Sequence, residues 1–339
     1  MRQMSKMSMT KFCLLFAFLT VCIPSAQAAS FESWLSDFKV KAQSRGISKS
    51  TLLSAFQDVS PHQRVIDLDG KQPERKKIGF ETYLRNVMSQ NRIDQGRINF
   101  QKNKYLLYKV EQQYGVPAQV IVSLWGIETS YGKNTGGFDL IQSLATLAWE
   151  GRRRDFFEKE LLAALEILQG GHVQRQDFKG SWAGAMGQNQ FMPTSWKRYA
   201  IDANGDGHKD IWSTQEDIFS SSANYLKENG WNQNYPWGWQ VSVPSNIQLS
   251  LASAKVKKPL MEWVRMGVHF SSGQIPNGQA QTSVRLVVPD GGNGRAYLVT
   301  SNFETILSWN RSDYFALTVG LLSDFIASQP TGTALHLNP

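Results

Sequence analysis

Apolar and polar positions repeat along this 339-residue chain with two different periods, and the change of period divides the chain into regions. Residues 30–59 show short helical patterns, with a capped helix start at residues 47–53. Residues 61–75 contain prolines and are predicted to be irregular. From residue 80 to 168 the period is mostly helical, and its last long amphipathic run begins at residue 154 and ends before two glycines.

A second period begins near residue 239. Residues 239–243 and 283–288 alternate between apolar and polar side chains and are rich in β-branched residues, which predicts strands. A helical pattern returns over residues 312–328, and the residues from 330 onward are predicted to be a loose tail. The pattern therefore indicates an α+β protein that is mainly helical.

The first 28 residues have the pattern of a secretory signal. They hold three basic residues, an apolar run too short to span a membrane, and a small-residue site ending at Ala28. Both cysteines, Cys13 and Cys22, lie inside this segment. Cys22 is a candidate for lipid attachment, but Val21 stands where a small residue is normal. We therefore expect cleavage after Ala28 and a soluble exported protein, and a lipid anchor at Cys22 is the less favoured alternative.

The net charge and the aromatic content limit the classes of molecule that this protein is expected to bind. Because the signal carries three basic and no acidic residues, its removal lowers the formal charge from +8 to +5. This mild excess suits an acidic polymer better than nucleic acid, and no nucleic-acid motif surrounds the basic clusters. Six of the eleven tryptophans lie within residues 182–239. Indole rings bind the apolar faces of sugars, although they are equally common in cores.

Glu128 is the most informative candidate for catalysis. It ends a nearly continuous apolar run, and at helical spacing it shares a face with Ile121, Leu124 and Trp125. A carboxyl group in such surroundings loses hydration, which raises its pKa toward the value a general acid needs at neutral pH. The alternative is a carboxylate at a helix end that pairs with an arginine or lysine elsewhere.

Two further segments carry polar groups suited to a neutral ligand. Residues 180–193 combine four small residues with amide and hydroxyl side chains, which fits a glycan. A tight loop packed against a helix is the alternative. In residues 302–312, Ser308 and Asn310 are either part of a binding site or helix caps.

The segment that starts at Asp202 has the spacing of an EF-hand calcium loop, with oxygen side chains at positions 1, 3 and 5 and glycine at 6. Ser213 replaces the usual acidic residue at position 12, so a longer loop would have to be closed by Glu216 or Asp217. A solvated turn is the alternative. The predicted calcium ligands are Asp202, Asn204, Asp206, His208 through its backbone carbonyl, and Glu216.

Taken in order, five motifs resemble the lytic murein transglycosylase B family. They are residues 126–132, 144–148 and 184–193, the loop from 202, and residues 310–312. The resemblance extends over residues 31–326 and implies a lysozyme-like helical core with an N-terminal helical region and a small antiparallel β subdomain. The regions expected are a signal (1–28), an N-terminal helical region (29–79), a catalytic core (80–238) containing the calcium loop (202–216), a β subdomain (239–300), a C-terminal core segment (301–329) and a tail (330–339).

The resemblance also implies roles for individual residues. Glu128 is the expected acid, Ser181 and Gln190 lie near the cleaved sugar, and Asn310 lies near Glu128 or the developing charge; Met186 and Trp309 complete the expected substrate contacts. The chain departs from the family at Asn189, where proline is common, and at Trp309, where tyrosine is usual. The second change removes a hydroxyl group but keeps an aromatic face, so we expect altered binding without loss of activity.

The expected activity is cleavage of the β-1,4 bond between N-acetylmuramic acid and N-acetylglucosamine in peptidoglycan, with 1,6-anhydromuramic acid ends. Only one well-placed carboxylate is visible in the motifs, whereas ordinary glycosidases use two. The alternatives are a hydrolytic muramidase and a non-catalytic peptidoglycan-binding protein. We expect a structural Ca²⁺ ion, no organic cofactor and no nucleic acid. A monomer that acts on glycan strands in the periplasm of a Gram-negative bacterium is expected, with cell-wall synthesis or division proteins as candidate partners.

Overall fold

The computed structural model describes residues 30–71, 78–291 and 294–328, and this part of the chain is mainly helical. The predicted signal and tail lie outside these residues. The helices are α1 (Phe31–Ser44), α2 (Lys49–Ala55), α3 (Gln63–Gly70), α4 (Phe80–Val87), α5 (Gln90–Lys102), α6 (Lys104–Tyr114), α7 (Ala118–Thr129), α8 (Leu140–Glu150), α9 (Arg154–Gln169), α10 (Pro193–Tyr199), α11 (Gln215–Glu228), α12 (Leu260–Arg265), α13 (Ser301–Trp309) and α14 (Asp313–Ala327). The strands are β1 (Phe138–Asp139), β2 (Lys179–Gly180), β3 (Gly238–Ser242), β4 (Lys258–Pro259), β5 (His269–Phe270), β6 (Ser283–Val287) and β7 (Ala296–Val299).

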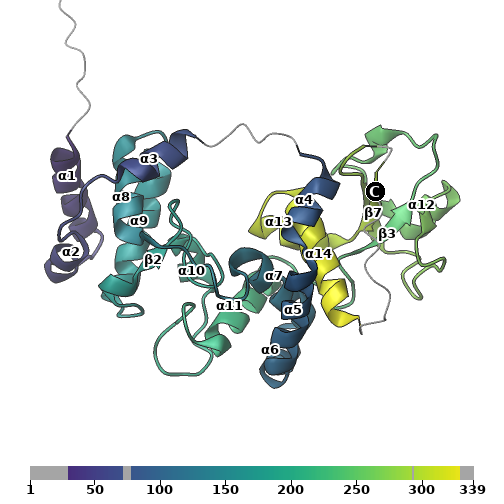
Figure 1. Cartoon of the computed structure of the whole chain (residues 1–339), viewed down its shortest axis with the longest axis horizontal. Helices are drawn as coiled ribbons and strands as arrows, with labels where there is room; N and C mark the ends of the chain where they lie inside the picture. The colour runs from purple at the N-terminus through teal and green to yellow at the C-terminus, as the bar shows by residue number, and fades with distance from the viewer. Residues whose placement is uncertain (1–29, 72–77, 292–293, 329–339) are drawn as a thin grey trace, which may run out of the picture.

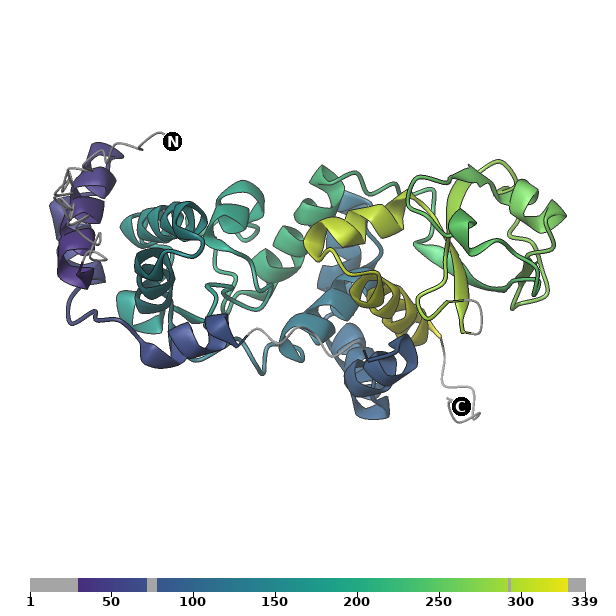
Figure 2. The same cartoon turned by 90° about the horizontal axis from the view of Figure 1, so that it is seen from above.

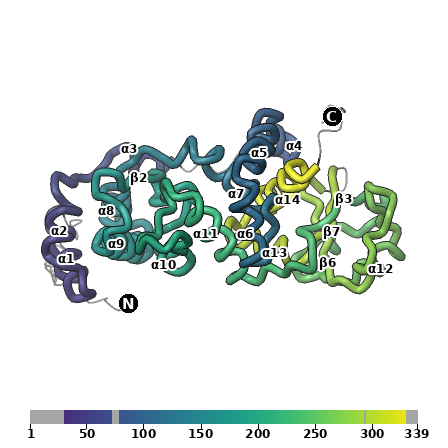
Figure 3. The backbone as a smooth tube through the Cα atoms, turned by 90° about the horizontal axis from the view of Figure 1, so that it is seen from below, coloured from purple at the N-terminus to yellow at the C-terminus, as the bar shows by residue number. Residues whose placement is uncertain are grey.

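These elements form an elongated row of four groups (Figures 1 and 2). The α1–α2 pair lies at one end, beside α8 and α9. The α4–α7 helices and α13–α14 lie beyond α10 and α11, and the β subdomain with α12 lies at the far end (Figure 3). The mainly α fold with a small β subdomain, predicted from the sequence, is confirmed.

Local signals in the sequence explain several helix ends. The Ser48 hydroxyl accepts a hydrogen bond from the Thr51 amide at 3.1 Å, which confirms the capped start predicted at residues 47–53. Helix α9 ends at Gln169 and is followed by Gly170, as the glycine pair indicated. Ser312 caps α14 through its side chain. In each case the cap satisfies backbone groups that have no partner inside the helix.

The prediction that residues 61–75 are irregular is wrong for the residues that the structure describes, because Gln63–Gly70 forms helix α3. This short helix buries Val65, and its Asp69 is only 3% exposed. The Asp69 carboxylate accepts a hydrogen bond from Arg152 Nε at 2.8 Å. A helix of this length is unstable alone, so tertiary contacts that no local pattern records must stabilise it. Residues 72–77 lie outside the described part.

Helix α7 is at the centre of the helical core. It packs against α5, α6, α11 and α14, and nearly all of its side chains are buried. One of its two buried hydroxyls, on Ser123, donates to the Val319 carbonyl of α14 at 2.7 Å. A helix that is apolar on every face needs neighbours on every side. The last turn of α7, which contains Glu128, is therefore packed against neighbouring helices and only partly exposed.

The β subdomain is an antiparallel sheet with strand order β4-β6-β7-β3-β5 and its own apolar cluster. Its Arg285, on β6, is 4% exposed and binds two carboxylates of the helical core. Arg285 Nε is 2.6 Å from Glu304 of α13, and Nη2 is 3.1 Å from Asp313 of α14. These ion pairs fix the sheet against the two helices that flank residues 310–312.

A close approach of α14 to the sheet gives a stability prediction. A Cβ atom added to Gly320 would lie 2.3 Å from the buried Trp237 ring, whereas one added to Gly70 meets nothing within 4 Å. Alanine is intrinsically better than glycine in a helix by about 1 kcal/mol, but overpacking a core typically costs about 1–3 kcal/mol. We expect Gly320→Ala to lower the free energy of unfolding in denaturant titrations by up to about 2 kcal/mol, which is the overpacking cost less the helix gain. The matched Gly70→Ala should be neutral or slightly stabilising, and an equal effect of both would contradict the packing argument.

Candidate active site

Glu128 lies in the last turn of α7, on the face predicted from the sequence. Ile121 and Leu124 on this face are completely buried, and Trp125 is 6% exposed. The Glu128 side chain keeps some accessible surface at the helix end. The buried apolar neighbours therefore cover one side of the carboxyl group. Its partly exposed side can contact a ligand.

Burial raises the pKa of Glu128 from its ordinary value of 4.5 to about 7. The Trp309 indole Nε1 donates a hydrogen bond to Glu128 Oε1 at 2.9 Å, and this bond lowers the pKa by favouring the ionised form. None of the ion pairs between described residues involves Glu128. The alternative of a carboxylate paired with arginine or lysine is therefore wrong for this structure, and the group can hold a proton near neutral pH.

The turn after Glu128 is conformationally unusual. Ser130, Tyr131 and Gly132 have φ values of 51°, 61° and 82°, a run of left-handed residues that is costly for the two that carry side chains. Tyr131 stabilises the turn by donating its hydroxyl to the Arg92 carbonyl at 2.6 Å. Its ring lies over Gly126, where a Cβ would approach it to 2.6 Å. Gly126 is therefore required by the packing of Tyr131.

Gln188 joins the glutamate motif to the glycine-rich strip, which is residues 180–193. Its Oε1 accepts from Trp125 Nε1 at 2.7 Å, and its backbone carbonyl accepts from Thr129 Oγ1 at 3.0 Å. Its Nε2 donates to the Trp212 carbonyl at 2.7 Å. A Cβ on Gly132 would lie 2.4 Å from Gln188 Oε1. The sequence did not predict this linking role of Gln188. The available signal was an amide side chain inside a glycine-rich motif.

The strip folds back on itself through bridges between Gly180 and Met186 and between Met186 and Phe191. The Ser181 hydroxyl accepts from the Ala185 amide at 3.0 Å. Gln190 adopts φ 49° and donates Nε2 to the carbonyls of Thr135 and Gly187, at 3.1 and 3.0 Å. These bonds hold Ser181 and Gln190 at the partly exposed surface of the strip.

Two other strip residues are buried. Met186 is completely buried and packs beneath the exposed residues of the strip. Its predicted contact with substrate stays a prediction. Asn189, where the family often has proline, is 2% exposed. Its Nδ2 donates to the Ile218 carbonyl and to Ser222 Oγ, both at 2.7 Å, and so attaches the strip to α11. The side-chain amide thus provides a tether that proline cannot.

Trp309 is more than the aromatic surface that the sequence predicted. Its ring lies 5.2 Å from Phe191 and 4.7 Å from Tyr225, while its N–H reaches Glu128. The indole N–H therefore replaces the hydroxyl group that a tyrosine would supply, and unlike a hydroxyl it donates a hydrogen bond but cannot accept one. Asn310 follows as the exposed C-cap of α13, and its predicted role near the developing charge stays a prediction.

The loop from Asp202 is held by its own side chains. Asp202 accepts from the amides of Gly205 and Gly207 at 2.8 and 2.9 Å, and Asp206 Oδ1 accepts from the His208 amide at 2.8 Å. Asp217 is completely buried, and burial together with the charges of Asp202 and Asp206 raises its pKa.

The donors of this loop are all hard oxygens, which suits calcium. Glu216, the predicted closing ligand, is exposed, whereas the buried Asp217 carboxylate accepts from the Ala203 amide at 2.7 Å and so lies against the loop. Within the described residues, no three His, Cys, Asp or Glu side chains converge closely enough to hold a metal ion. The oxygen donors of this loop therefore suit a cation, but its described side chains are not arranged as a complete coordination shell.

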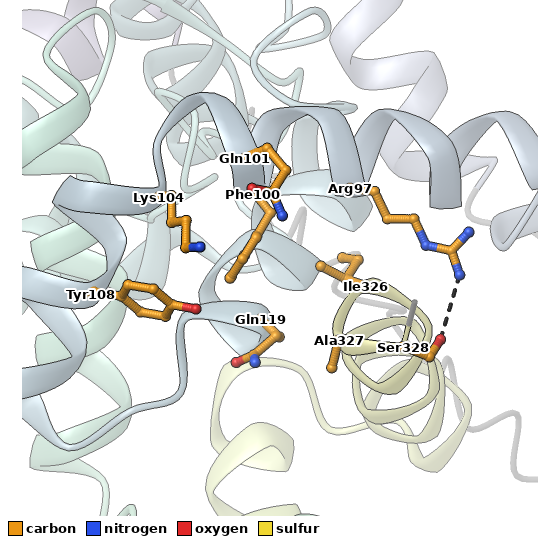
Figure 4. Close-up of a pocket in the computed structure, with 9 residues that line it drawn as sticks. All are labelled: Arg97, Phe100, Gln101, Lys104, Tyr108, Gln119, Ile326, Ala327 and Ser328. Atoms are coloured by element: carbon orange, nitrogen blue, oxygen red, sulfur yellow. Dashed lines mark hydrogen bonds between the residues drawn. The ribbon is translucent and has the colours of Figure 1, made fainter. Parts of the chain in front are cut away.

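A separate cavity of about 380 Å³ lies near the opposite end of α7 (Figure 4). It is lined by residues of α5, α6, α7 and the end of α14, including Arg97, Lys104, Tyr108 and Gln119. Gln119 is in the first turn of α7 and Glu128 is in the last. None of the predicted site residues lines this cavity, so it is distinct from the candidate active site.

Comparison with known proteins identifies this arrangement. A family model described as a transglycosylase SLT domain matches residues 30–324. The chain is 32% identical over 260 residues to membrane-bound lytic murein transglycosylase B of Escherichia coli (strain K12), an alignment that covers 76% of this chain and 70% of that protein. The chain belongs to the lytic murein transglycosylase B family. As a member of this family, the protein is an enzyme of the lytic transglycosylase class.

Solved structures of lytic transglycosylases have the same fold. SltB3 from Pseudomonas aeruginosa, in complex with NAG-NAM-pentapeptide, is 42% identical with a TM-score of 0.86, over 88% of this chain and 80% of that one. The lytic transglycosylase Slt35 of Escherichia coli, in complex with calcium, is 29% identical with a TM-score of 0.74, over 86% and 92% of the two chains. These matches confirm the lysozyme-like core with its additional β subdomain.

The Trp309 hydrogen bond gives a prediction about the pKa of Glu128. Trp309→Phe keeps an aromatic ring and removes the donor, so the ionised carboxylate loses a favourable contact and the pKa should rise above about 7 by about one unit. The measurement is an NMR titration of ¹³C-labelled glutamate carboxyls, with Glu128→Gln to assign the signal. Trp239→Phe, in β3, serves as the control and should leave the titration unchanged. A pKa that stays constant or falls in Trp309→Phe would contradict this account of the site.

Proposed function

We propose that this protein cleaves the β-1,4 bond between N-acetylmuramic acid and N-acetylglucosamine in peptidoglycan and leaves 1,6-anhydromuramic acid ends. The observation that carries the proposal is the Glu128 carboxyl group, whose pKa is raised by burial to about 7 at an accessible helix end. A group with this pKa is protonated often enough to act as an acid and ionised easily enough to act afterwards as a base. The relative SltB3, which has been solved with a NAG-NAM-pentapeptide, supports the substrate class.

The reaction needs one carboxyl group used twice. Protonated Glu128 donates its proton to the glycosidic oxygen, and the bond from that oxygen to C1 of the muramic residue breaks. The resulting carboxylate, which accepts the Trp309 N–H, then takes the proton of the muramic C6 hydroxyl. The C6 oxygen bonds to C1 and closes the anhydro ring, and Glu128 is protonated again. No water is consumed, so no second carboxylate is required to activate one.

The indole N–H also selects which oxygen carries the proton. Trp309 Nε1 is a donor only, and it points at Glu128 Oε1. The acid proton therefore resides on Oε2, because a proton on Oε1 would compete with the indole hydrogen. Oε2 is accordingly the atom that we assign to proton transfer in both steps.

The neighbouring residues have roles as substrate contacts in this proposal. Ser181 and Gln190 lie at the surface of the strip and offer neutral hydrogen-bonding groups to the acetamido and hydroxyl groups of the sugar. The partly exposed Trp309 ring offers an apolar face to a sugar ring. Asn310 is placed at the exposed end of α13, where its amide can contact substrate, and Met186 supports the strip from beneath.

Two alternative functions are compatible with the sequence motifs. A water-using muramidase would share the same acid but release reducing ends. A non-catalytic wall-binding protein would have no need to keep a carboxyl group with a raised pKa against an indole donor, so the site favours an enzyme.

We further propose that the Asp202 loop binds a structural Ca²⁺ ion, held by the side chains of Asp202, Asn204 and Asp206, the backbone carbonyl of His208, and Asp217 in place of Glu216. The support is the all-oxygen donor set, the burial of Asp217 close to two other carboxylates, and the calcium complex of the relative Slt35. The loop lies outside the chemical step, so we assign the ion to stability.

We also propose that the protein acts in the periplasm of a Gram-negative bacterium. Its Escherichia coli relative is named as membrane-bound. No helix in the described residues is long and apolar enough to cross a membrane. The predicted signal and the alternative lipid anchor at Cys22 lie outside the described residues.

Mass spectrometry of a digest of purified murein tests the proposed reaction. The muropeptides should be lighter by one water than those that a hydrolytic lysozyme releases from the same sample, and they should resist borohydride reduction. Reducible products would establish the muramidase alternative.

Glu128→Gln is the control for this digest. It should bind murein and fold but release almost no product. Because a raised pKa means that the buried carboxylate costs stability above its ordinary pKa of 4.5, the variant should also melt at a higher temperature than wild type at about pH 8 and equally at about pH 4. Substantial product from this variant would move the acid role to another residue.

Chelation tests the metal assignment separately. A cation bound only by the folded state stabilises it by about a few kcal/mol at saturation, so chelation should lower the melting temperature while activity far below melting changes little. Asp206→Ala and Asp217→Asn should remove the calcium-dependent shift, whereas Glu216→Gln should keep it. Loss of turnover at an unchanged melting temperature would show that the ion acts in catalysis, and loss of the shift in Glu216→Gln alone would restore Glu216 as the ligand.

A further inference from the structure

Two arginines near the active site have no acidic partner. Arg198 is in the last turn of α10, and Arg311 follows α13; both are exposed. The charged residues beside them are already paired, Lys197 with Glu166 and Asp313 with Arg285. Across the described part of the chain, no ion pair includes Arg198 or Arg311. Two unneutralised guanidinium groups are therefore available to a ligand.

Both guanidinium groups lie near one tyrosine, although they come from distant segments. Helix α11, which carries Tyr225, lies between α10 and α13 (Figures 1 and 3). The Arg198 guanidinium lies 5.1 Å from the Tyr199 ring centre, and that ring is 4.5 Å from Tyr225. Burial raises the pKa of Tyr225 to about 12, while the charges of Arg198 and Arg311 oppose this rise. Arg311 lies three residues after Ser308, whose carbonyl accepts the Tyr225 hydroxyl, so both arginines belong to segments that contact Tyr225.

This cationic pair is connected to the catalytic carboxyl group by direct contacts. The Tyr225 hydroxyl donates to the Ser308 carbonyl at 2.7 Å, and its ring lies 4.7 Å from Trp309. Trp309 in turn donates to Glu128. The two arginines therefore lie at the exposed end of a chain of aromatic contacts that leads to Glu128.

The chemistry of the proposed substrate indicates what they would bind. The acetamido and hydroxyl groups of a glycan are neutral, and the lactyl carboxyl group of a muramic residue that carries a peptide is an amide. The negative charges of such a strand therefore reside on the free carboxylates of its peptides. We propose that Arg198 and Arg311 bind free carboxylates of the peptide carried by the muramic residue, and so make the enzyme prefer strands whose peptide carboxylates are free over strands whose peptides are amidated. Guanidinium groups suit this task because they bind carboxylates through two parallel hydrogen bonds. This inference rests on the proposed function.

The test compares two synthetic NAG-NAM tetrasaccharides that carry the same peptide, one with its carboxylates free and the other with them converted to primary amides. In Arg198→Gln and Arg311→Gln, KM for the free-acid substrate should rise about threefold to fivefold for each change, with kcat little altered, since exposed ion pairs are worth up to about 1 kcal/mol. KM for the amidated substrate should stay at the wild-type value. The wild-type KM for the free acid should rise with salt, and this dependence should be weaker in the double variant.

Lys197→Gln is the matched control, because it removes the same charge from the same helix at a residue already paired with Glu166. It should behave as wild type with both substrates. Arg311→Lys keeps the charge and should recover part of the lost affinity.

Equal increases in KM for both substrates would overturn the proposal, and so would a wild-type enzyme that does not distinguish them. A wild-type enzyme that cleaves neither substrate while binding both would instead contradict the proposed function.

Discussion

The structure depends on keeping one carboxyl group poorly hydrated at the end of an apolar helix. Helix α7 can end inside the protein because α5, α6, α11 and α14 cover its sides. This burial raises the pKa of Glu128 to about 7, and a single neutral donor, the Trp309 indole, limits the rise. A lysine or arginine in that position would hold the group ionised and remove its use as an acid.

The position of the donor is itself a tertiary property. Trp309 ends α13, and the buried Arg285 of the β subdomain binds Glu304 on that helix and Asp313 just beyond it. The small sheet therefore fixes both sides of the segment that supplies the indole to Glu128. We interpret the β subdomain as a support for the active site, in addition to any contact that it makes with substrate.

The positive and neutral groups of the site are separated in space. The Trp309 indole, which donates to Glu128, carries no charge, so it limits the rise of the Glu128 pKa without abolishing it. The unpaired arginines lie at the exposed edge, beyond the aromatic rings of Tyr225 and Trp309. Such an arrangement lets a charged substituent of a substrate be recognised while the acid stays in an apolar environment.

The sequence by itself determined the mainly helical class, the capped start at Ser48, the strands near residues 239 and 283, and Glu128 as the unusual carboxylate. These features are local, because the hydrophobic period, the helix caps and an isolated charge in an apolar run are each determined by residues that are close in the sequence. Only the tertiary structure decided that residues 63–70 form a helix, because Arg152 pairs with Asp69 there. It also decided that Trp309 reaches Glu128, that Gln188 links two motifs, and that Asp217 and not Glu216 is buried beside the loop. Each of these depends on segments far apart in the chain, and no local pattern specifies which of them will meet.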